Sequence, residues 1–309
     1  MPFVAQVASW RSKQMRIFVT GASGWIGSAV TRDLVAAGHR VLGLARSDAS
    51  AKAVADAGGE VHRGALDDLE SLKRGAAVCE AVIHTAFVHD FANFEANCAI
   101  DAAAIEALGA TLEGSGRPLI VSSGMGITPG RLGTEDDSVP ANFPFPRRSE
   151  QVGLSMAARG VRAMVVRLSP SVHGDGDHGL VATFVRTARE RGFATYVGDG
   201  KNRWPAVHRF DAARIYRLAL EKGASGARFH GAADEGIPIR EIAEVIGRRL
   251  NVPAVSKTPE EAVALFGMVG RVLAMDIPAS SALTQQRLAW HPTGVGLIAD
   301  LETGRYFET

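Results

Sequence analysis

The sequence predicts an α/β fold, with a doubly wound parallel sheet and a smaller, mixed C-terminal lobe that binds substrate. Two observations support this prediction. As far as residue 168, short apolar runs alternate with amphipathic stretches, which is the pattern of repeated strand–helix–strand units. A glycine-rich turn, Gly21–Gly27, stands between the first apolar run and the first amphipathic stretch. In such sheets ligands bind beyond the carboxyl ends of the strands, so we expect the later lobe to cover that edge.

The expected strands are short apolar runs, and the expected helices are the longer stretches between them. The strands are 16–20, 40–45, 60–64, 81–86, 118–123 and 162–168. The helices are 25–37, 50–57, 69–75, the Ala-rich stretch 92–114, and 147–159. After residue 168 the rhythm loosens, with helices at 180–192, 211–221, 238–250, 259–266 and 294–306 and a strand at 194–197.

The composition argues against several classes of protein. The 34 basic and 33 acidic residues leave a net charge of +1, so no overall field attracts nucleic acid or a membrane surface. No stretch is long and apolar enough to span a bilayer, and the first 14 residues lack the apolar core of a signal peptide. Cys79 and Cys98 stand in apolar contexts, which favours reduced thiols and a cytoplasmic location. The nine histidines show no metal-binding spacing, so we expect no metal.

The turn after the first strand has the spacing of a dinucleotide-binding loop. Gly21 permits the tight turn, Gly24 lets the backbone approach a pyrophosphate, and Gly27 lets the helix pack closely on the strand. Backbone N–H groups at the start of the helix, around Ser23, Trp25 and Ile26, suit a phosphate. The chain therefore divides into a flexible leader (1–14), a Rossmann-type dinucleotide-binding domain (15–168) and a mainly substrate-binding lobe (169–309), parts of which return to the sheet.

The end of the second strand predicts which dinucleotide binds. An NAD site of this type places an acidic residue there, where it bonds to the ribose 2′-hydroxyl. Ala45 stands at that position and Arg46 follows it. Because a guanidinium matches a 2′-phosphate, we predict that NADP(H) is preferred over NAD(H). The structural alternative is a surface arginine at a strand end.

These motifs resemble those of the extended short-chain dehydrogenase/reductase superfamily, and the resemblance covers roughly residues 15–306. The supporting motifs are Thr20–Gly27, Leu66-Asp67-Asp68, His84-Thr85-Ala86, Val121-Ser122-Ser123, Arg167–Gly174 and Val207–Asp211. The resemblance implies that Leu66 and Asp67 cover the adenine and that Thr85, Ala86 and Ser122 line the cofactor site. It also implies that Ser123 stands near the place of the superfamily's catalytic serine, although glycine follows it.

The Tyr-x-x-x-Lys motif that performs the superfamily's chemistry is absent. None of the tyrosines, Tyr196, Tyr216 and Tyr306, has a lysine four residues later. The chain instead resembles an atypical branch with Arg-x-Ser-Glu, here Arg147–Glu150, and Asn-Arg-Trp-Pro-x-Val-His, here 202–208. Members of that branch are described mostly as NADP-dependent oxidoreductases or epimerase-like proteins, so the resemblance says little about substrate.

Three side chains are candidates for the chemistry. Ser123 could donate a hydrogen bond to a carbonyl oxygen, and His208 could donate a proton near neutral pH. Arg147, or its neighbour Arg148, could supply a fixed cation for an oxyanion or a substrate carboxylate. Each has a structural alternative: Ser123 bonding to backbone, His208 organising the lobe junction, and the arginines pairing with Glu150 or with solvent.

The aromatic residues predict an apolar substrate pocket. The expected lining is Phe87, Met125, Phe145, His173 and Trp204, with core packing as the alternative for each aromatic. We therefore predict an NADP(H)-dependent oxidoreductase that acts on a small or medium apolar carbonyl or enone compound. The alternatives are an epimerase or dehydratase, and a regulatory protein that binds the cofactor without turnover. The expected partner is a small-molecule substrate, and a homodimer through 92–114 and 147–159 is a further expectation.

Overall fold

A computed structural model describes residues 14–126, 128, 130–139 and 145–308. Its centre is a seven-stranded sheet in which every neighbouring pair is parallel, in the order β3-β2-β1-β4-β5-β6-β10. The strands are β1 (Arg16–Thr20), β2 (Arg40–Ala45), β3 (Glu60–Arg63), β4 (Ala81–His84), β5 (Pro118–Gly124), β6 (Arg162–Leu168) and β10 (Arg228–Gly231). The order reverses between β1 and β4, so the predicted doubly wound α/β fold is confirmed.

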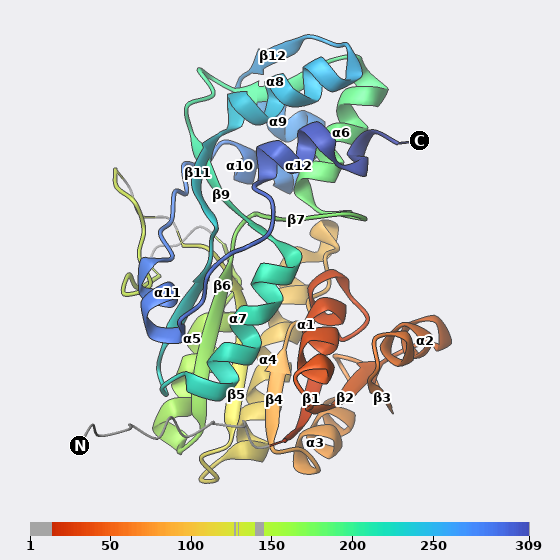
Figure 1. The fold of residues 1–309 in the computed structure, drawn as a ribbon, viewed down its shortest axis with the longest axis vertical. Helices are drawn as coiled ribbons and strands as arrows, with labels where there is room; N and C mark the ends of the chain where they lie inside the picture. Colours follow the sequence, from red (N-terminus) through yellow and green to blue (C-terminus); the bar gives the residue numbers. More distant parts are fainter. Residues whose placement is uncertain (1–13, 127, 129, 140–144, 309) are drawn as a thin grey trace, which may run out of the picture.

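Helices cover both faces of this sheet (Figure 1). On one face lie α1 (Trp25–Ala36), α2 (Asp48–Asp56) and α7 (Arg209–Lys222), and on the other lie α3 (Leu69–Ala77), α4 (Phe94–Leu112) and α5 (Ser149–Ser155). Successive strand residues point to opposite faces, so Ile17 and Val19 pack under α1 while Phe18 packs under α3 and α4. Burial on both faces explains why these strands are apolar without alternation.

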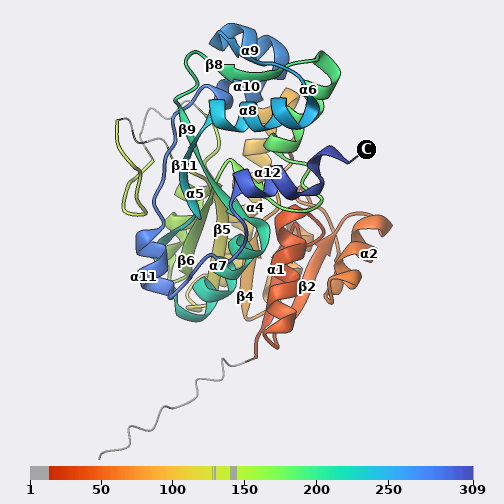
Figure 2. The ribbon, with the colours of Figure 1, turned by 45° about the horizontal axis from the view of Figure 1, so that its top comes forward.

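The lobe sits beyond the carboxyl ends of the strands (Figures 1 and 2). It holds a two-stranded parallel sheet, β8 (Ala194–Val197) with β12 (Ala254–Lys257), and the helices α6 (Leu180–Arg191), α8 (Ile239–Leu250), α9 (Pro259–Phe266), α10 (Met268–Leu273) and α12 (Leu297–Thr303). A three-stranded mixed sheet, β11-β9-β7, joins the lobe to the large sheet, and α11 (Ala282–Leu288) packs beside β10 and α7.

The strands of the joining sheet were not expected from the sequence. They are β7 (Ser171–His173), β9 (Arg203–His208) and β11 (Asp234–Pro238). Pro205 lies inside the central strand β9, where a missing N–H normally breaks the ladder. The structure accommodates it because the register with β11 shifts between Asp234 and Ile237, opposite this part of β9. Because proline is unusual inside a strand, the sequence did not predict β9.

The other predicted elements lie near their expected positions, whereas β10, β12, α10 and α11 were also not expected from the sequence. The helix expected at 147–159 is shorter, because α5 begins at Ser149 and gives way to a 3₁₀ turn (Met156–Arg159) before Gly160. Short 3₁₀ turns also occur at Phe91–Asn93, before α4, and at Arg305–Phe307. Among the described helices, none combines the length and apolar character that crossing a membrane requires. The leader predicted at residues 1–14 lies outside the described residues except for Gln14.

Candidate functional site

The glycine loop lies at the carboxyl end of β1 and leads directly into α1. Gly21 has φ +71°, a left-handed conformation, and an added Cβ would lie 2.7 Å from the backbone nitrogen of Ala86. The turn closes through a 2.8 Å hydrogen bond from the Gly24 N–H to the Gly21 carbonyl. A Cβ on Gly27 would lie only 2.0 Å from that same carbonyl oxygen. The backbone of the loop therefore packs directly against neighbouring backbone. The first N–H groups of α1 remain available to bind a phosphate.

Trp25 braces the loop against the lobe. Its indole Nε1 donates a 2.8 Å hydrogen bond to the carbonyl of Val172 in β7. The guanidinium of Arg209 lies 3.8 Å from the centre of the indole and donates to the Ser28 hydroxyl at 3.2 Å. The His178 ring meets the indole edge-on at 5.5 Å. Trp25 and Ile26 are the first residues of α1, and their role at the cofactor stays a prediction. The Trp25 side chain itself contacts β7, Arg209 and His178.

Arg46 stands exposed directly after β2, next to the start of α2. Ser47 caps α2 by accepting a hydrogen bond from the Ser50 N–H at 3.2 Å. The nearest acidic residue along the chain, Asp48, is paired with Arg63 at 2.5 Å. Within the described part of the chain no hydrogen bond or ion pair engages the Arg46 guanidinium, so it is available to an added phosphate. Leu66 is half-buried and Asp67 exposed in the turn that follows β3.

A buried polar chain runs beneath the end of β4. The Thr85 hydroxyl donates to the Thr20 carbonyl at 2.8 Å, and the Ala86 N–H donates to the Thr20 hydroxyl at 3.4 Å. Thr20 in turn bonds to His84 Nδ1 at 2.9 Å. His84 Nε2 lies 3.1 Å from Asp101 of α4. This chain fixes Thr85 and Ala86 beside the glycine loop.

The two serines at the end of β5 point to opposite faces of the sheet. The Ser122 hydroxyl bonds to the His84 carbonyl at 2.9 Å and to the Tyr216 hydroxyl of α7 at 2.7 Å. Ser123 lies half-buried on the other face, which α5 covers. Both hydrogen bonds of the Ser122 hydroxyl are therefore made within the protein. The role of Ser122 at the cofactor stays a prediction.

The variant Tyr216→Phe tests how much the hydrogen bond between Tyr216 and Ser122 contributes to the stability of the fold. Burial raises the pKa of the Tyr216 phenol well above its ordinary value, so the group is a neutral partner of Ser122. Loss of one neutral buried hydrogen bond is expected to lower the free energy of unfolding by about 1 kcal/mol. Urea denaturation measures that change, with Tyr196→Phe in the lobe as the control. An unchanged free energy of unfolding would contradict the assignment.

Arg147 lies directly before α5, at the end of β5. Its Nε donates to the Ser149 hydroxyl at 2.7 Å, and its Nη2 donates to the Ser122 carbonyl at 3.3 Å. The Ser149 hydroxyl donates a 2.5 Å hydrogen bond to Asp101, which extends the polar chain beneath β4. Ser123 and Arg147 are thus brought to the same edge of the sheet.

Glu150 does not pair with Arg147, which was one structural alternative. Its carboxylate is buried and bonds to Arg167 through both oxygens, at 2.6 and 2.7 Å, and to Arg228 at 2.7 Å. Burial acts to raise the pKa of Glu150, but the two guanidinium groups outweigh it and hold the pKa below its ordinary value. Glu150 is therefore a charged residue that ties α5 to β6 and β10.

Phe87 and Phe145 meet in an aromatic cluster beside Arg147. The cluster consists of Phe87, His89, Phe91, Phe94 and Phe145, with ring centres 5.2 to 6.4 Å apart. The Arg147 guanidinium lies 4.1 Å from the centre of the Phe87 ring. Phe91 is 39% exposed, so the cluster reaches the surface. These two predicted pocket residues therefore lie together next to a predicted catalytic residue.

His208 and His173 lie at the lobe junction. His208 is half-buried and caps α7 by accepting from the Phe210 N–H at 3.4 Å, and its ring lies 5.6 Å from that of His173. Burial lowers the pKa of His208, so a smaller fraction of the ring carries a proton to donate near neutral pH. His173 is fully buried and bonds to Asp300 at 2.8 Å. The burial and contacts of the two residues favour structural roles, with His208 organising the lobe junction and His173 packing in the core.

Trp204 and Met125 belong to the core of the lobe. Trp204 is completely buried, with the Phe184 ring 5.7 Å away. Met125 is 7% exposed, and its N–H donates to the Leu168 carbonyl at 3.0 Å. Burial of both side chains favours core packing over a place in the wall of a substrate pocket.

Three residues of the site were missed by sequence reasoning. Asp101 and Ser149 lie 48 positions apart, and no local pattern signals that they meet. His89 was not among the predicted site residues, although it follows β4 as Phe87 does. Its pKa is lowered by burial and by the nearby Arg147 cation. Its place in the loop after a central strand could have marked it as a site residue.

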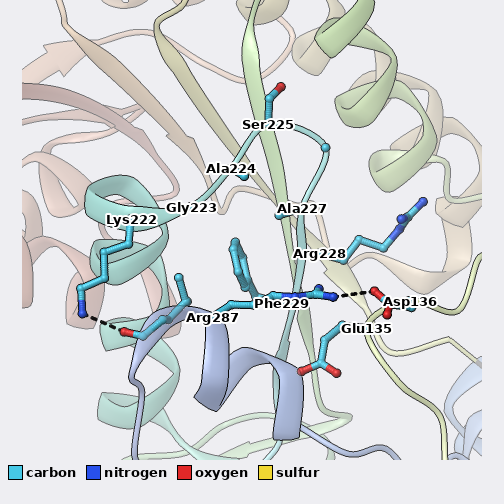
Figure 3. A pocket seen from close by; sticks show the side chains of 12 residues that line it. Glu135, Asp136, Lys222, Gly223, Ala224, Ser225, Ala227, Arg228, Phe229 and Arg287 are labelled. Atoms are coloured by element: carbon cyan, nitrogen blue, oxygen red, sulfur yellow. Dashed lines mark hydrogen bonds and ion pairs between the residues drawn. The ribbon is translucent and has the colours of Figure 1, made fainter.

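A separate cavity of about 510 Å³ lies at the opposite edge of the sheet. It is lined by the loop Gly223–Ala227, which precedes β10, and by residues of α11 (Figure 3). Its cationic side chains are already bonded: Arg287 pairs with Asp136 at 2.7 Å, and Lys222 donates to the Leu288 carbonyl at 2.8 Å. The cavity is therefore not part of the site at the carboxyl ends of the strands.

The parallel sheet, its reversal of strand order and the glycine loop define a Rossmann-fold protein of the extended short-chain dehydrogenase/reductase type. A family model described as the NAD dependent epimerase/dehydratase family matches residues 17–230, and the chain belongs to that family. The match runs from β1 to β10, which is the whole of the large sheet.

Relatives of the chain include both close and distant proteins. The chain is 50% identical over 296 residues to the Schizosaccharomyces pombe protein C2A9.02, covering 95% of this chain and all of that one. It is 30% identical over 263 residues to a 2-alkyl-3-oxoalkanoate reductase of Stenotrophomonas maltophilia, covering 79% and 78% of the two chains. The crystal structure of dTDP-glucose 4,6-dehydratase from Streptomyces venezuelae superposes with a TM-score of 0.75 at 21% identity, covering 95% of this chain and 97% of that one. This structural likeness shows the shared fold.

Proposed function

We propose that this chain is an NADP(H)-dependent oxidoreductase that transfers hydride to or from a small or medium carbonyl or enone compound with an apolar part. The glycine loop carries the proposal, because beside Gly24, at the start of α1, an added Cβ would meet only the Gly21 carbonyl oxygen, which leaves space for a pyrophosphate against the backbone. The distant relative described as a reductase of 2-alkyl-3-oxoalkanoates supports an oxidoreductase that acts on a carbonyl group.

The residues present fit a dinucleotide. The amides at the start of α1 would hold the pyrophosphate, Arg46 the 2′-phosphate, and Leu66 and Asp67 the adenine. Thr85 and Ala86, fixed by Thr20, would face the nicotinamide end. The nicotinamide ring supplies the hydride when the cofactor is bound. The chain's own task is to position the carbonyl compound and to manage the charge on its oxygen.

Ser123 is the group that would orient the carbonyl. It lies at the end of β5, where the half-buried hydroxyl is close to the surface, and the neighbouring Ser122 hydroxyl is engaged elsewhere. A hydrogen bond donated by Ser123 would polarise the carbonyl, and the oxygen would take up a proton from water once the carbon has accepted the hydride. The aromatic cluster would receive the apolar part of the substrate.

Steady-state oxidation of NADPH in the presence of a panel of ketones, aldehydes and enones tests this function. We expect NADPH to be consumed with at least one compound, and Ser123→Ala to lower kcat. Failure of every compound to cause NADPH oxidation would contradict the proposal. Cofactor that stays bound through purification and shows no net oxidation would instead indicate an epimerase or dehydratase.

A further inference from the structure

Among the described residues, Arg147 donates hydrogen bonds to neutral groups alone. Its two hydrogen bonds go to the Ser149 hydroxyl and, at 3.3 Å, to the Ser122 carbonyl. A guanidinium carries five N–H donors, so most of this group remains unused in the described structure. The half-buried side chain also rests on the Phe87 ring, which limits its contact with water. Burial lowers the pKa of Arg147, which agrees with a cation that is poorly solvated.

The nearby acids are committed to other groups. Each oxygen of Asp101 accepts a hydrogen bond, one from His84 and one from Ser149; its charge acts on Arg147, but no ion pair joins the two side chains. Glu150 is held by Arg167 and Arg228. The residues outside the described ranges include no Asp or Glu side chain.

Two other arginines, Arg117 and Arg162, also lack an acidic partner among the described residues, and both donate hydrogen bonds to backbone carbonyls instead. Arg117 donates to the carbonyls of three residues, Ala76, Cys79 and Thr111. Arg162 donates to two carbonyls at the end of α7, where the helix dipole favours a cation. Among the described residues, Arg147 bonds to one serine hydroxyl and one distant carbonyl and to no helix C-terminus, so its remaining N–H donors are available to an anionic ligand.

We propose that Arg147 binds a carboxylate of the substrate, which makes the substrate a 2-oxo or 3-oxo acid with an apolar tail. Arg147 contacts the carbonyl of Ser122, the residue before Ser123, so a carboxylate on Arg147 lies close to a ketone held by Ser123. A 2-oxo or 3-oxo acid separates its carboxylate from its ketone by one or two carbon–carbon bonds. The aromatic cluster then takes the tail. The inference rests on the proposed function, because it assigns the substrate class of that site.

The first test measures binding without turnover. In the presence of NADPH, calorimetry compares 3-phenylpropanoate with 3-phenylpropanamide, which has the same shape and no charge. The wild-type protein is expected to bind the acid about tenfold more tightly, because a charge-assisted hydrogen bond is stronger than a neutral one. Arg147→Gln should remove this preference, Arg147→Lys should keep part of it, and Arg148→Gln, which changes the exposed neighbour, should leave it unchanged. Equal binding of the two probes, or no binding of either, would overturn the proposal.

The second test measures turnover and separates the two proposals. Reduction of 2-oxo-4-phenylbutanoate is compared with reduction of its methyl ester, and Arg147→Gln should raise KM for the acid and leave the ester unaffected. Equal kcat/KM for acid and ester, unchanged in Arg147→Gln, would keep the oxidoreductase and reject the carboxylate site. Absence of any reduction, together with an acid preference that Arg147→Gln removes, would reject the oxidoreductase and keep the carboxylate site.

Discussion

Gly24→Ala is expected to lower the affinity for NADPH by about 10- to 100-fold, because the added methyl group occupies the space in which the pyrophosphate meets the backbone. The protein itself tolerates the change, since an added Cβ would find only the Gly21 carbonyl oxygen, at 3.2 Å. Calorimetric titration with NADPH measures the affinity, and thermal denaturation without cofactor measures the stability. The expected result is weak binding by a protein whose stability is nearly that of the wild type.

Gly27→Ala provides the contrast. Its Cβ would lie 2.0 Å from the Gly21 carbonyl oxygen and 2.8 Å from the Thr85 hydroxyl, so the turn itself must move. This variant should lose stability as well as cofactor affinity. The pair therefore separates a glycine kept for the cofactor from a glycine kept for the fold. Full NADPH affinity in Gly24→Ala would refute the pyrophosphate assignment.

Arg46→Ala is expected to weaken NADPH binding by about 10- to 100-fold and to leave NADH binding nearly unchanged. The physical reason is the loss of charge-assisted hydrogen bonds to a 2′-phosphate that NADH lacks. Calorimetric titration of both cofactors measures the two affinities. Ionic strength must be held fixed, because salt screens an exposed charge.

A matched control lies at the other end of the same strand. Arg40 is also exposed, and it pairs with Glu60 at 2.6 Å at the amino end of β2. Arg40→Ala removes the same charge at the opposite edge of the sheet, so it should affect neither cofactor. Equal losses of NADPH and NADH affinity in Arg46→Ala would remove the basis for the NADP(H) preference.

The part of the fold that could be predicted is the part whose pattern is local. Strands β1, β2 and β6 coincide with their expected bounds because each is built around a short apolar run between polar turns. The strands β7 and β10 are three or four residues long, and β9 contains Pro205, so no pattern distinguished them from loops. Their partners lie far away in the sequence, and pairing rather than propensity stabilises them.

The residues of the candidate site also divide into those that a local sequence pattern predicts and those that only the folding of distant segments brings together. The glycine spacing and Arg46 were readable because a motif and a strand end fix their positions. The alternation of Ser122 and Ser123 across the sheet could also have been derived from the strand. The chain from Thr20 through His84 and Asp101 to Ser149 could not, because it joins four separate elements. The burial of Trp204 and His173 likewise depends on how the lobe packs.

The most direct test of the account is a titration of the wild-type protein with NADPH and with NADH, followed by heat of binding and by the thermal denaturation midpoint. The account predicts that NADPH binds more tightly and raises the midpoint further than NADH at equal concentration. No heat and no change in the midpoint with either dinucleotide would contradict it.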